Sequence, residues 1–160
     1  MSRLDSFIRR MTAQRDVLNH ISGKVRKIEG PIIELGLGNG RTFDHLRELF
    51  PDRRIIAFDR AVASHKSSTP DAENLVIGEI CESGARFHGI DAALVHADIG
   101  TGYDAKDAVT LTWLPGLAAH MLAPGGIVAS GLPLVHPWLE QLPLPSSVKA
   151  GRYFLYRRTS

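Results

Sequence analysis

A glycine-rich loop between an apolar run and an amphipathic segment constrains this chain more than any other feature. Residues 31–41 read PIIELGLGNGR, and the spacing predicts a strand over 32–35, a turn, and a helix over 42–50. The turn has glycine at every second position: Gly36, Gly38 and Gly40. Glycine permits positive φ and close approach of a ligand, and the following helix N-terminus offers unpaired N–H groups. A nucleotide-like ligand fits such a loop.

The even spacing of the glycines differs from the dinucleotide pattern G-x-G-x-x-G, and Glu34 stands two positions before the first glycine. A carboxylate there suits a cationic ligand better than a pyrophosphate. Together these residues resemble motif I of the class I S-adenosylmethionine-dependent methyltransferases, (Asp/Glu)-x-Gly-x-Gly-x-Gly. The resemblance implies that the cofactor is S-adenosylmethionine and that the loop binds it through Glu34, Gly36, Gly38, Asn39 and Gly40. A bare turn between a strand and a helix gives the same letters, so the neighbouring segments matter.

The segments that follow predict a Rossmann-like α/β fold. Further strands are expected over 54–59, 75–78, 91–97 and 127–130, and further helices over 82–88 and 107–122, the last kinked or split at Pro115-Gly116. Residues 60–74 read as an irregular connection or a short helix, and 123–126 as a tight turn. We predict one domain over 1–160, with a doubly wound, mostly parallel sheet and helices on both faces.

Acidic residues close the expected strands. Asp59 ends the second strand 19 positions after Gly40, about where a Rossmann-like unit places its ribose-binding carboxylate, and Arg60 follows it. A helix cap or a turn is the alternative role for Asp59. Asp98 follows the fourth strand, and ligands of open α/β sheets bind beyond the carboxyl ends of the strands. We therefore expect these carboxylates to share one site with the glycine loop.

The third strand is followed by Gly78, Glu79 and Ile80, which match the adenine-binding segment of the resembling family. The resemblance implies that Glu79 binds the adenine amino group, although it could also cap the next helix. By the same resemblance, Glu34 or Asp98 would hold the amino group of the methionine part. The run LAPGGIV at 122–128 resembles the segment before strand five of these enzymes.

The two ends of the chain match the family less specifically. Residues 1–30 form a helical arm with apolar residues at helical spacing, for which Gly23 is a suitable C-terminal end. This arm carries seven basic and three acidic side chains, which favours a solvated helix face over an anionic partner. Residues 132–150 contain four prolines and read as loop, with one helical turn over 138–142. An aromatic strand over 153–156, at or near a sheet edge and antiparallel, closes the chain.

No catalytic set is visible, and methyl transfer by direct displacement does not require one, because alignment of the reacting atoms supplies much of the acceleration. Candidates for a base or an acceptor-positioning residue are His96, Tyr103, Asp104 and His136. A structural role is the stronger reading for His96 on its apolar strand. We expect no metal: catechol-type methyltransferases hold magnesium with an Asp after strand four, which Asp98 matches, and with an Asp-Asn pair at strand five, where this chain has Ser130-Gly131.

The acceptor is expected to be a small molecule that enters past the N-terminal helix and the loops at 98–107 and 131–150. No Asn/Asp-Pro-Pro motif of amide and adenine methyltransferases follows the fourth strand, and the net charge of +2 does not indicate nucleic acid. The single Cys81 and the lack of a long apolar run favour a cytoplasmic protein without membrane contact, which could be a homo-oligomer. A non-catalytic S-adenosylmethionine-binding module remains an alternative, and an NAD-binding Rossmann protein a weaker one.

Overall fold

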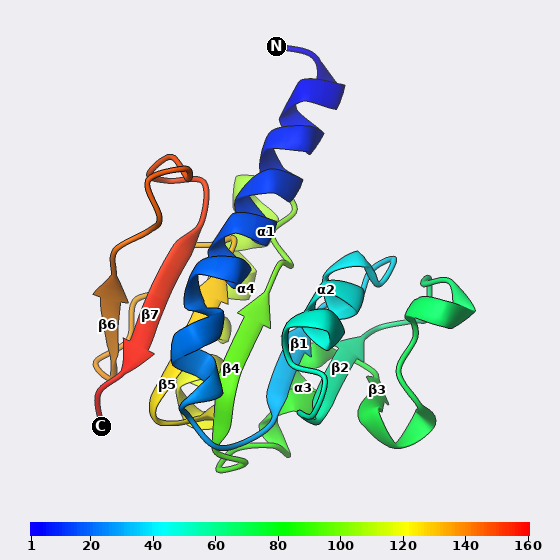
Figure 1. The fold of residues 1–160 in the computed structure, drawn as a ribbon, viewed down its shortest axis with the longest axis vertical. Coiled ribbons are helices and arrows are strands. Elements are labelled where there is room, and N and C mark those ends of the chain that lie inside the picture. Colours follow the sequence, from blue (N-terminus) through cyan, green and yellow to red (C-terminus); the bar gives the residue numbers. More distant parts are fainter.

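The computed structural model describes all 160 residues and contains a seven-stranded sheet with the order β3-β2-β1-β4-β5-β7-β6 (Figure 1). The strands are β1 (Ile32–Leu35), β2 (Ile55–Asp59), β3 (Leu75–Ile77), β4 (Ala92–Ala97), β5 (Leu122–Ser130), β6 (Leu139–Leu142) and β7 (Phe154–Arg158). β1 to β5 run parallel to one another, and β7 pairs antiparallel with both β5 and β6. This arrangement is the predicted doubly wound, mostly parallel sheet.

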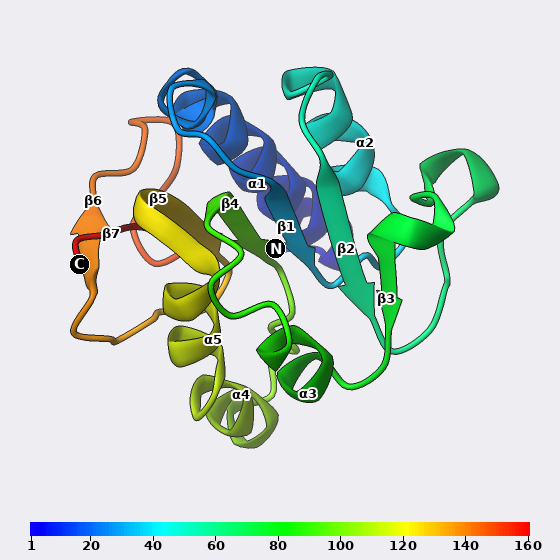
Figure 2. The same cartoon turned by 90° about the horizontal axis from the view of Figure 1, so that it is seen from below.

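Helices cover both faces of the sheet (Figure 2). They are α1 (Arg3–Arg26), α2 (Arg41–Leu49), α3 (Ile80–Ala85), α4 (Asp104–Leu111) and α5 (Leu114–Met121), with short 3-10 turns at Lys66–Ser68 and Ala72–Asn74. α1 and α2 lie on one face, and α3, α4 and α5 lie on the other. None of these helices is both long and apolar enough to cross a lipid bilayer.

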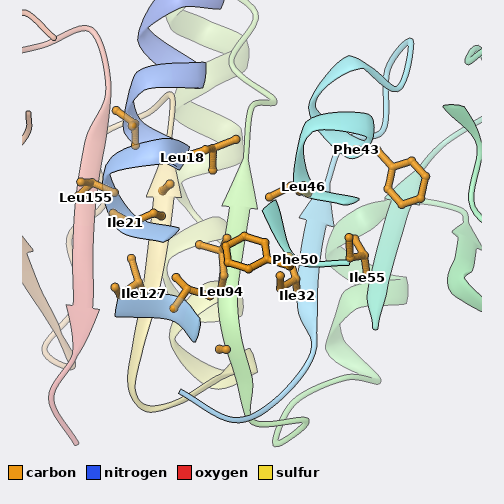
Figure 3. Close-up of a cluster of buried hydrophobic side chains, with 14 of the residues drawn as sticks. Leu18, Ile21, Ile32, Phe43, Leu46, Phe50, Ile55, Leu94, Ile127 and Leu155 are labelled. Atoms are coloured by element: carbon orange, nitrogen blue, oxygen red, sulfur yellow. The ribbon is translucent and has the colours of Figure 1, made fainter. Parts of the chain in front are cut away.

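The face under α1 and α2 is closed by one hydrophobic cluster (Figure 3). Leu18 and Ile21 of α1 belong to it together with Leu94 and Ile127 of the sheet, and all four are almost completely buried. Removing such side chains from water stabilises the fold by roughly 1.5–3 kcal/mol each. α1 is therefore part of the core, and it is more than a cover for a sheet edge.

The opposite face is closed by a second cluster, in which strand residues pack against α5. Phe58 of β2 is fully buried there and meets the ring of Phe87 edge to face, with the ring centroids 5.1 Å apart. Since both faces are covered, the central strands are almost entirely apolar, as expected for buried parallel strands, and Glu34 and His96 are the buried exceptions on β1 and β4.

The N-terminal helix differs from the prediction at its C-terminal end. It continues through Gly23 to Arg26, because the Gly23 position is helical and nothing there requires a left-handed residue. At its start, Ser2 and Asp5 form a reciprocal capping box. The apolar residues Leu4 and Ile8 are exposed, because the first turns of α1 project beyond the sheet (Figure 1).

Smaller differences occur in the second half of the chain. The expected helix over 107–122 is split, as predicted, but the break falls at 112–113, because a proline is tolerated in the first turn of α5. β5 starts at Leu122, and the expected turn at 123–126 is an irregularity within this strand, where its register with β4 shifts. Residues 139–142 form the edge strand β6, and the helical turn predicted there was wrong.

Candidate active site

The sheet order reverses between β1 and β4, and a cleft of about 850 Å³ opens at the carboxyl ends of these strands. Such a switch point is the usual ligand site of an open α/β sheet. The cleft is bordered by the glycine loop, the ends of β2 and β4, the start of α3, and side chains of α1 and α4. Its volume lies in the range of roughly 300–1,000 Å³ that is typical of small-molecule sites.

The glycine loop presents backbone to the cleft. Gly36, Gly38 and Asn39 line it, and a Cβ on Gly38 would meet no atom within 4 Å, so the space beside this residue is open to a ligand. Gly40 does not line the cleft. It caps α2 with φ +82°, and a Cβ there would lie 2.2 Å from the carbonyl oxygen of Ser68. Gly40 therefore serves the packing of the loop and does not face a ligand.

Asp59 is held at the end of β2 by two backbone donors. Its Oδ2 accepts the N–H of Gly38 at 2.9 Å, and its Oδ1 accepts the N–H of Arg60 at 2.7 Å. Each carboxylate oxygen has a second lone pair, so both can still accept a hydroxyl hydrogen bond. The bond to Gly38 ties the carboxylate to the glycine loop, and Asp59 lines the cleft half-buried.

Arg60 and Glu79 form an ion pair at the rim, with Nε of Arg60 3.1 Å from Oε2 of Glu79. Both side chains are more than half exposed, so the pair contributes little to stability. Glu79 is the first residue before α3, but its side chain makes no capping hydrogen bond. Glu79 and its neighbour Ile80 line the cleft, whereas Gly78 does not.

Asp98 lies in the cleft wall just after β4, half-buried. Gln14 of α1 is buried and donates a hydrogen bond from its Nε2 to Oδ2 of Asp98. The other oxygen of Asp98 faces Gly131, where a Cβ would lie 3.2 Å from it. α1 thus fixes a carboxylate that the sequence placed in the site.

Glu34 lies beneath the cleft and does not line it. Its Oε1 is 2.6 Å from Nδ1 of His96, its register partner on β4, and Nε2 of His96 hydrogen-bonds the hydroxyl of Tyr153. All three side chains are almost completely buried, and Oε2 of Glu34 has no hydrogen-bond partner. The acid of the glycine motif is therefore part of a buried polar chain across the sheet.

Burial and charge oppose each other in this chain. Burial alone would lower the pKa of His96, but the charge and hydrogen bond of Glu34, with Asp98 nearby, outweigh burial and leave the pKa raised. The pKa of Tyr153 is raised well above its usual value by burial and by the charges of Asp98 and Glu34. The raised pKa favours the imidazolium form of His96, which can donate one hydrogen bond to Glu34 and one to the hydroxyl of Tyr153.

Several predicted residues lie outside the cleft. Tyr103 and Asp104 are exposed at the start of α4 and do not line it. His136 lies near Trp138 and His120, with its ring centroid 5.9 Å from that of His120, and none of these rings borders the cleft. Residues 131–150 also contribute nothing to the lining, so the predicted entry past this loop is not part of the cleft.

The wall formed by α1 and α4 contains residues that the sequence did not single out. Among the cleft residues from these two helices and the start of α2 are Phe7, Arg10, Met11, Arg41, Lys106 and Val109. The N-terminal helix and the loop at 98–107, past which we expect the acceptor to enter, do border the cleft. The basic character of residues 1–30 predicts a solvated face, yet Arg10 lines the cleft. No three His, Cys, Asp or Glu side chains are grouped to hold a metal ion.

Comparisons with known proteins identify relatives of this chain. The sequence model of a family described as S-adenosyl-L-methionine methyltransferase matches residues 1–158. A crystal structure of an S-adenosyl-L-methionine methyl transferase from Silicibacter pomeroyi DSS-3 is 43% identical, with a TM-score of 0.90 and 99% of both chains covered. No match was found among curated protein sequences.

More distant structures share the fold. The aminoglycoside resistance methyltransferase NpmB1 is 14% identical with a TM-score of 0.55, covering 88% of this chain and 93% of its own. The 16S rRNA (adenine(1408)-N(1))-methyltransferase from Catenulisporales acidiphilia is 16% identical with a TM-score of 0.51, covering 88% and 92%. At these identities the likeness concerns the arrangement of the sheet and helices.

Proposed function

This chain belongs to the S-adenosyl-L-methionine methyltransferase family, and from that premise we propose that it methylates a small-molecule acceptor in the cleft at the β1–β4 switch point. The observation that carries the proposal is the meeting of Gly38, Asp59 and Asp98 in one cleft. Open backbone, a ribose-type carboxylate and a second carboxylate are what a cationic nucleoside cofactor requires.

The residues present fit S-adenosylmethionine. In this proposal Asp59 accepts the two ribose hydroxyls, because each of its oxygens retains an unused lone pair beside a backbone N–H. Glu79 and Ile80 contact the adenine, with Arg60 holding the Glu79 side chain by their ion pair. The open space beside Gly38 allows the ligand to approach the loop backbone.

In this proposal Asp98 binds the amino group of the methionine part of the cofactor. Of the two carboxylates considered for this role, Asp98 lines the cleft, whereas Glu34 is buried and already bonded to His96. Gln14 bonds Oδ2 of Asp98, and Oδ1, which lies against Gly131, accepts no hydrogen bond from a side chain, so the carboxylate keeps lone pairs for a cationic partner. Gln14 is then a positioning residue, because it acts through Asp98.

The bound cofactor supplies an electrophilic methyl group on a sulfonium. The chain contributes binding and alignment of the acceptor, which can provide much of the acceleration of a direct displacement. None of the four base candidates lines the cleft, so a mechanism without a protein base agrees best with the geometry. Half-buried Trp113 and Ile99 border the cleft and limit the access of water to it.

A binding experiment tests this assignment. Isothermal titration with S-adenosylmethionine, S-adenosylhomocysteine and NAD should give micromolar affinity for the adenosyl compounds, roughly −8 kcal/mol, and none for NAD. Asp59→Ala should abolish that binding, whereas Asp52→Ala, an exposed aspartate in the turn after α2, should leave it unchanged. Equal affinity of Asp59→Ala and the unmodified chain would refute the role of this carboxylate.

A further inference from the structure

The lining of the cleft includes three cations that make no ion pair. They are Arg10 of α1, Arg41 of α2 and Lys106 of α4. None of the acids in the same cleft forms an ion pair with these cations. Asp59 accepts two backbone N–H groups, Glu79 pairs with Arg60, and Asp98 accepts a hydrogen bond from Gln14. The three cations are therefore available to a ligand.

Two of these cations are placed by one aromatic ring. The guanidinium carbon of Arg10 lies 5.9 Å from the centroid of the Phe7 ring, and that of Arg41 lies 5.5 Å from it. A cation over an aromatic face is attracted by the negative face of the ring, which helps to hold the arginine in place. Two like charges on one ring repel each other, and an anion between them relieves that repulsion while accepting charge-assisted hydrogen bonds.

Apolar surface adjoins the cations. Met11 of α1, Val109 of α4 and the half-buried Trp113 border the same cleft. Polar groups at small-molecule sites fix orientation while apolar walls bury the body of the ligand. A ligand that contacts both the cations and this apolar surface therefore combines an anionic group with an apolar or aromatic body.

We propose that Arg10, Arg41 and Lys106 bind the anionic group, a carboxylate or a phosphate, of a small methyl acceptor whose body lies against Met11 and Trp113. This proposal rests on the function proposed above and names the chemistry of its acceptor. Guanidinium groups suit both anions, because their planar donors match two oxygens at once.

The placement of charge favours a small anion over a nucleic acid. Arg9 lies on a different groove of α1, together with Ile8 and residues 147–152, and Arg15 is paired with Asp16. Outside residues 1–30 the chain carries 12 basic and 14 acidic side chains. Sequence-independent RNA binding needs many phosphate contacts along a basic surface, whereas these unpaired cations gather in one cleft.

The test is titration of the full chain, saturated with S-adenosylhomocysteine, with benzoate, phenyl phosphate and benzyl alcohol. One of the two anions should bind at least about tenfold more tightly than the neutral alcohol, and the stronger anion identifies the preferred group. Arg10→Gln/Arg41→Gln should remove this preference, and the single Arg10→Gln on exposed α1 should reduce it. The matched control Arg9→Gln, one residue away on the other groove, should bind the anion like the unmodified chain.

The affinity for S-adenosylhomocysteine, measured first, separates the two proposals. If that ligand does not bind, the function proposed above fails. If it binds but the anions bind no better than benzyl alcohol, or no probe binds at millimolar concentration, the anionic acceptor is overturned. Tighter binding of a 20-base-pair RNA duplex, weakened as much by Arg9→Gln as by Arg10→Gln, would also overturn it in favour of a polyanion.

Discussion

Replacing His96 by leucine should destabilise the fold by about 3–5 kcal/mol, the usual cost of removing one partner of a buried ion pair. His96 and Glu34 have no exposed surface, and Oε2 of Glu34 already has no hydrogen-bond partner. Without the imidazolium, the Glu34 carboxylate would be left with neither a counter-charge nor a hydrogen bond. The hydroxyl of Tyr153 would lose its partner as well.

The double variant Glu34→Leu/His96→Leu is the matched control. It removes both charges and fills the space with apolar atoms, a replacement that is often neutral or stabilising in other proteins. It should recover about 2 kcal/mol of the stability lost in His96→Leu, and the remaining loss of about 1–3 kcal/mol is the cost of the unpartnered hydroxyl of Tyr153. A further Tyr153→Phe change should remove that remainder.

The pH dependence of the free energy of unfolding tests the role of His96 independently. Because the pKa of His96 is raised in the folded chain, protonated His96 stabilises the fold fully below about pH 6.5. This stabilisation is lost as the pH rises through the raised pKa. The free energy of unfolding should therefore fall between pH 6 and pH 9, and this component of the slope should be absent in His96→Leu.

Urea denaturation followed by circular dichroism at pH 6, 7, 8 and 9 measures both quantities on the same samples. The reasoning is refuted if His96→Leu lowers the free energy of unfolding by less than about 1 kcal/mol, since an unpaired buried charge destabilises a fold by more than that. It is also refuted if the double variant is less stable than the single one. Either result would mean that Glu34 and His96 do not act as a buried charge pair in the folded chain.

Three further predictions concern sites outside this network. Gly23→Ala should raise stability by about 1 kcal/mol in urea denaturation, because the position is helical and a Cβ there meets no atom, and a loss would contradict this. Gly40→Ala should lower stability by more than about 2 kcal/mol in the same assay, because φ is +82° and the new Cβ would clash with Ser68; an unchanged midpoint would disprove it. Burial and the charge of a neighbouring histidine lower the pKa of His88 and His136, so the free energy of unfolding should fall as the pH drops below about 6.5. In His136→Gln the free energy of unfolding should change less between pH 5 and pH 7.

The sequence was sufficient to predict the framework of the sheet. Every apolar run expected to form a strand up to β5 does so, because buried parallel strands are continuous apolar segments that need no knowledge of their partners. Asp59, Glu79 and Asp98 meet in one cleft as expected, since parallel strands bring their carboxyl ends to the same edge. Their contacts with a ligand remain a prediction.

The position of Glu34 could not be read from the motif. Glu34 and His96 stand opposite each other on β1 and β4, strands separated by 62 positions, and their side chains meet beneath the cleft. Only the strand order brings them together, so a linear pattern showed an acid beside a glycine loop and an unrelated histidine. The N-terminal helix was expected to border the site, but its lining side chains Phe7, Arg10 and Met11 were not identified, because helical periodicity gives the apolar face but not how far the helix projects beyond the sheet.

The position of β7 has a consequence for the order of folding. β7 follows β6 in the chain, yet it lies between β5 and β6 in the sheet, and β6 pairs with no other strand. During synthesis, residues 139–142 therefore leave the ribosome before any partner for their backbone exists. They must wait until residues 154–158 have paired with β5, so this edge of the sheet forms in the reverse of the order in which it is translated.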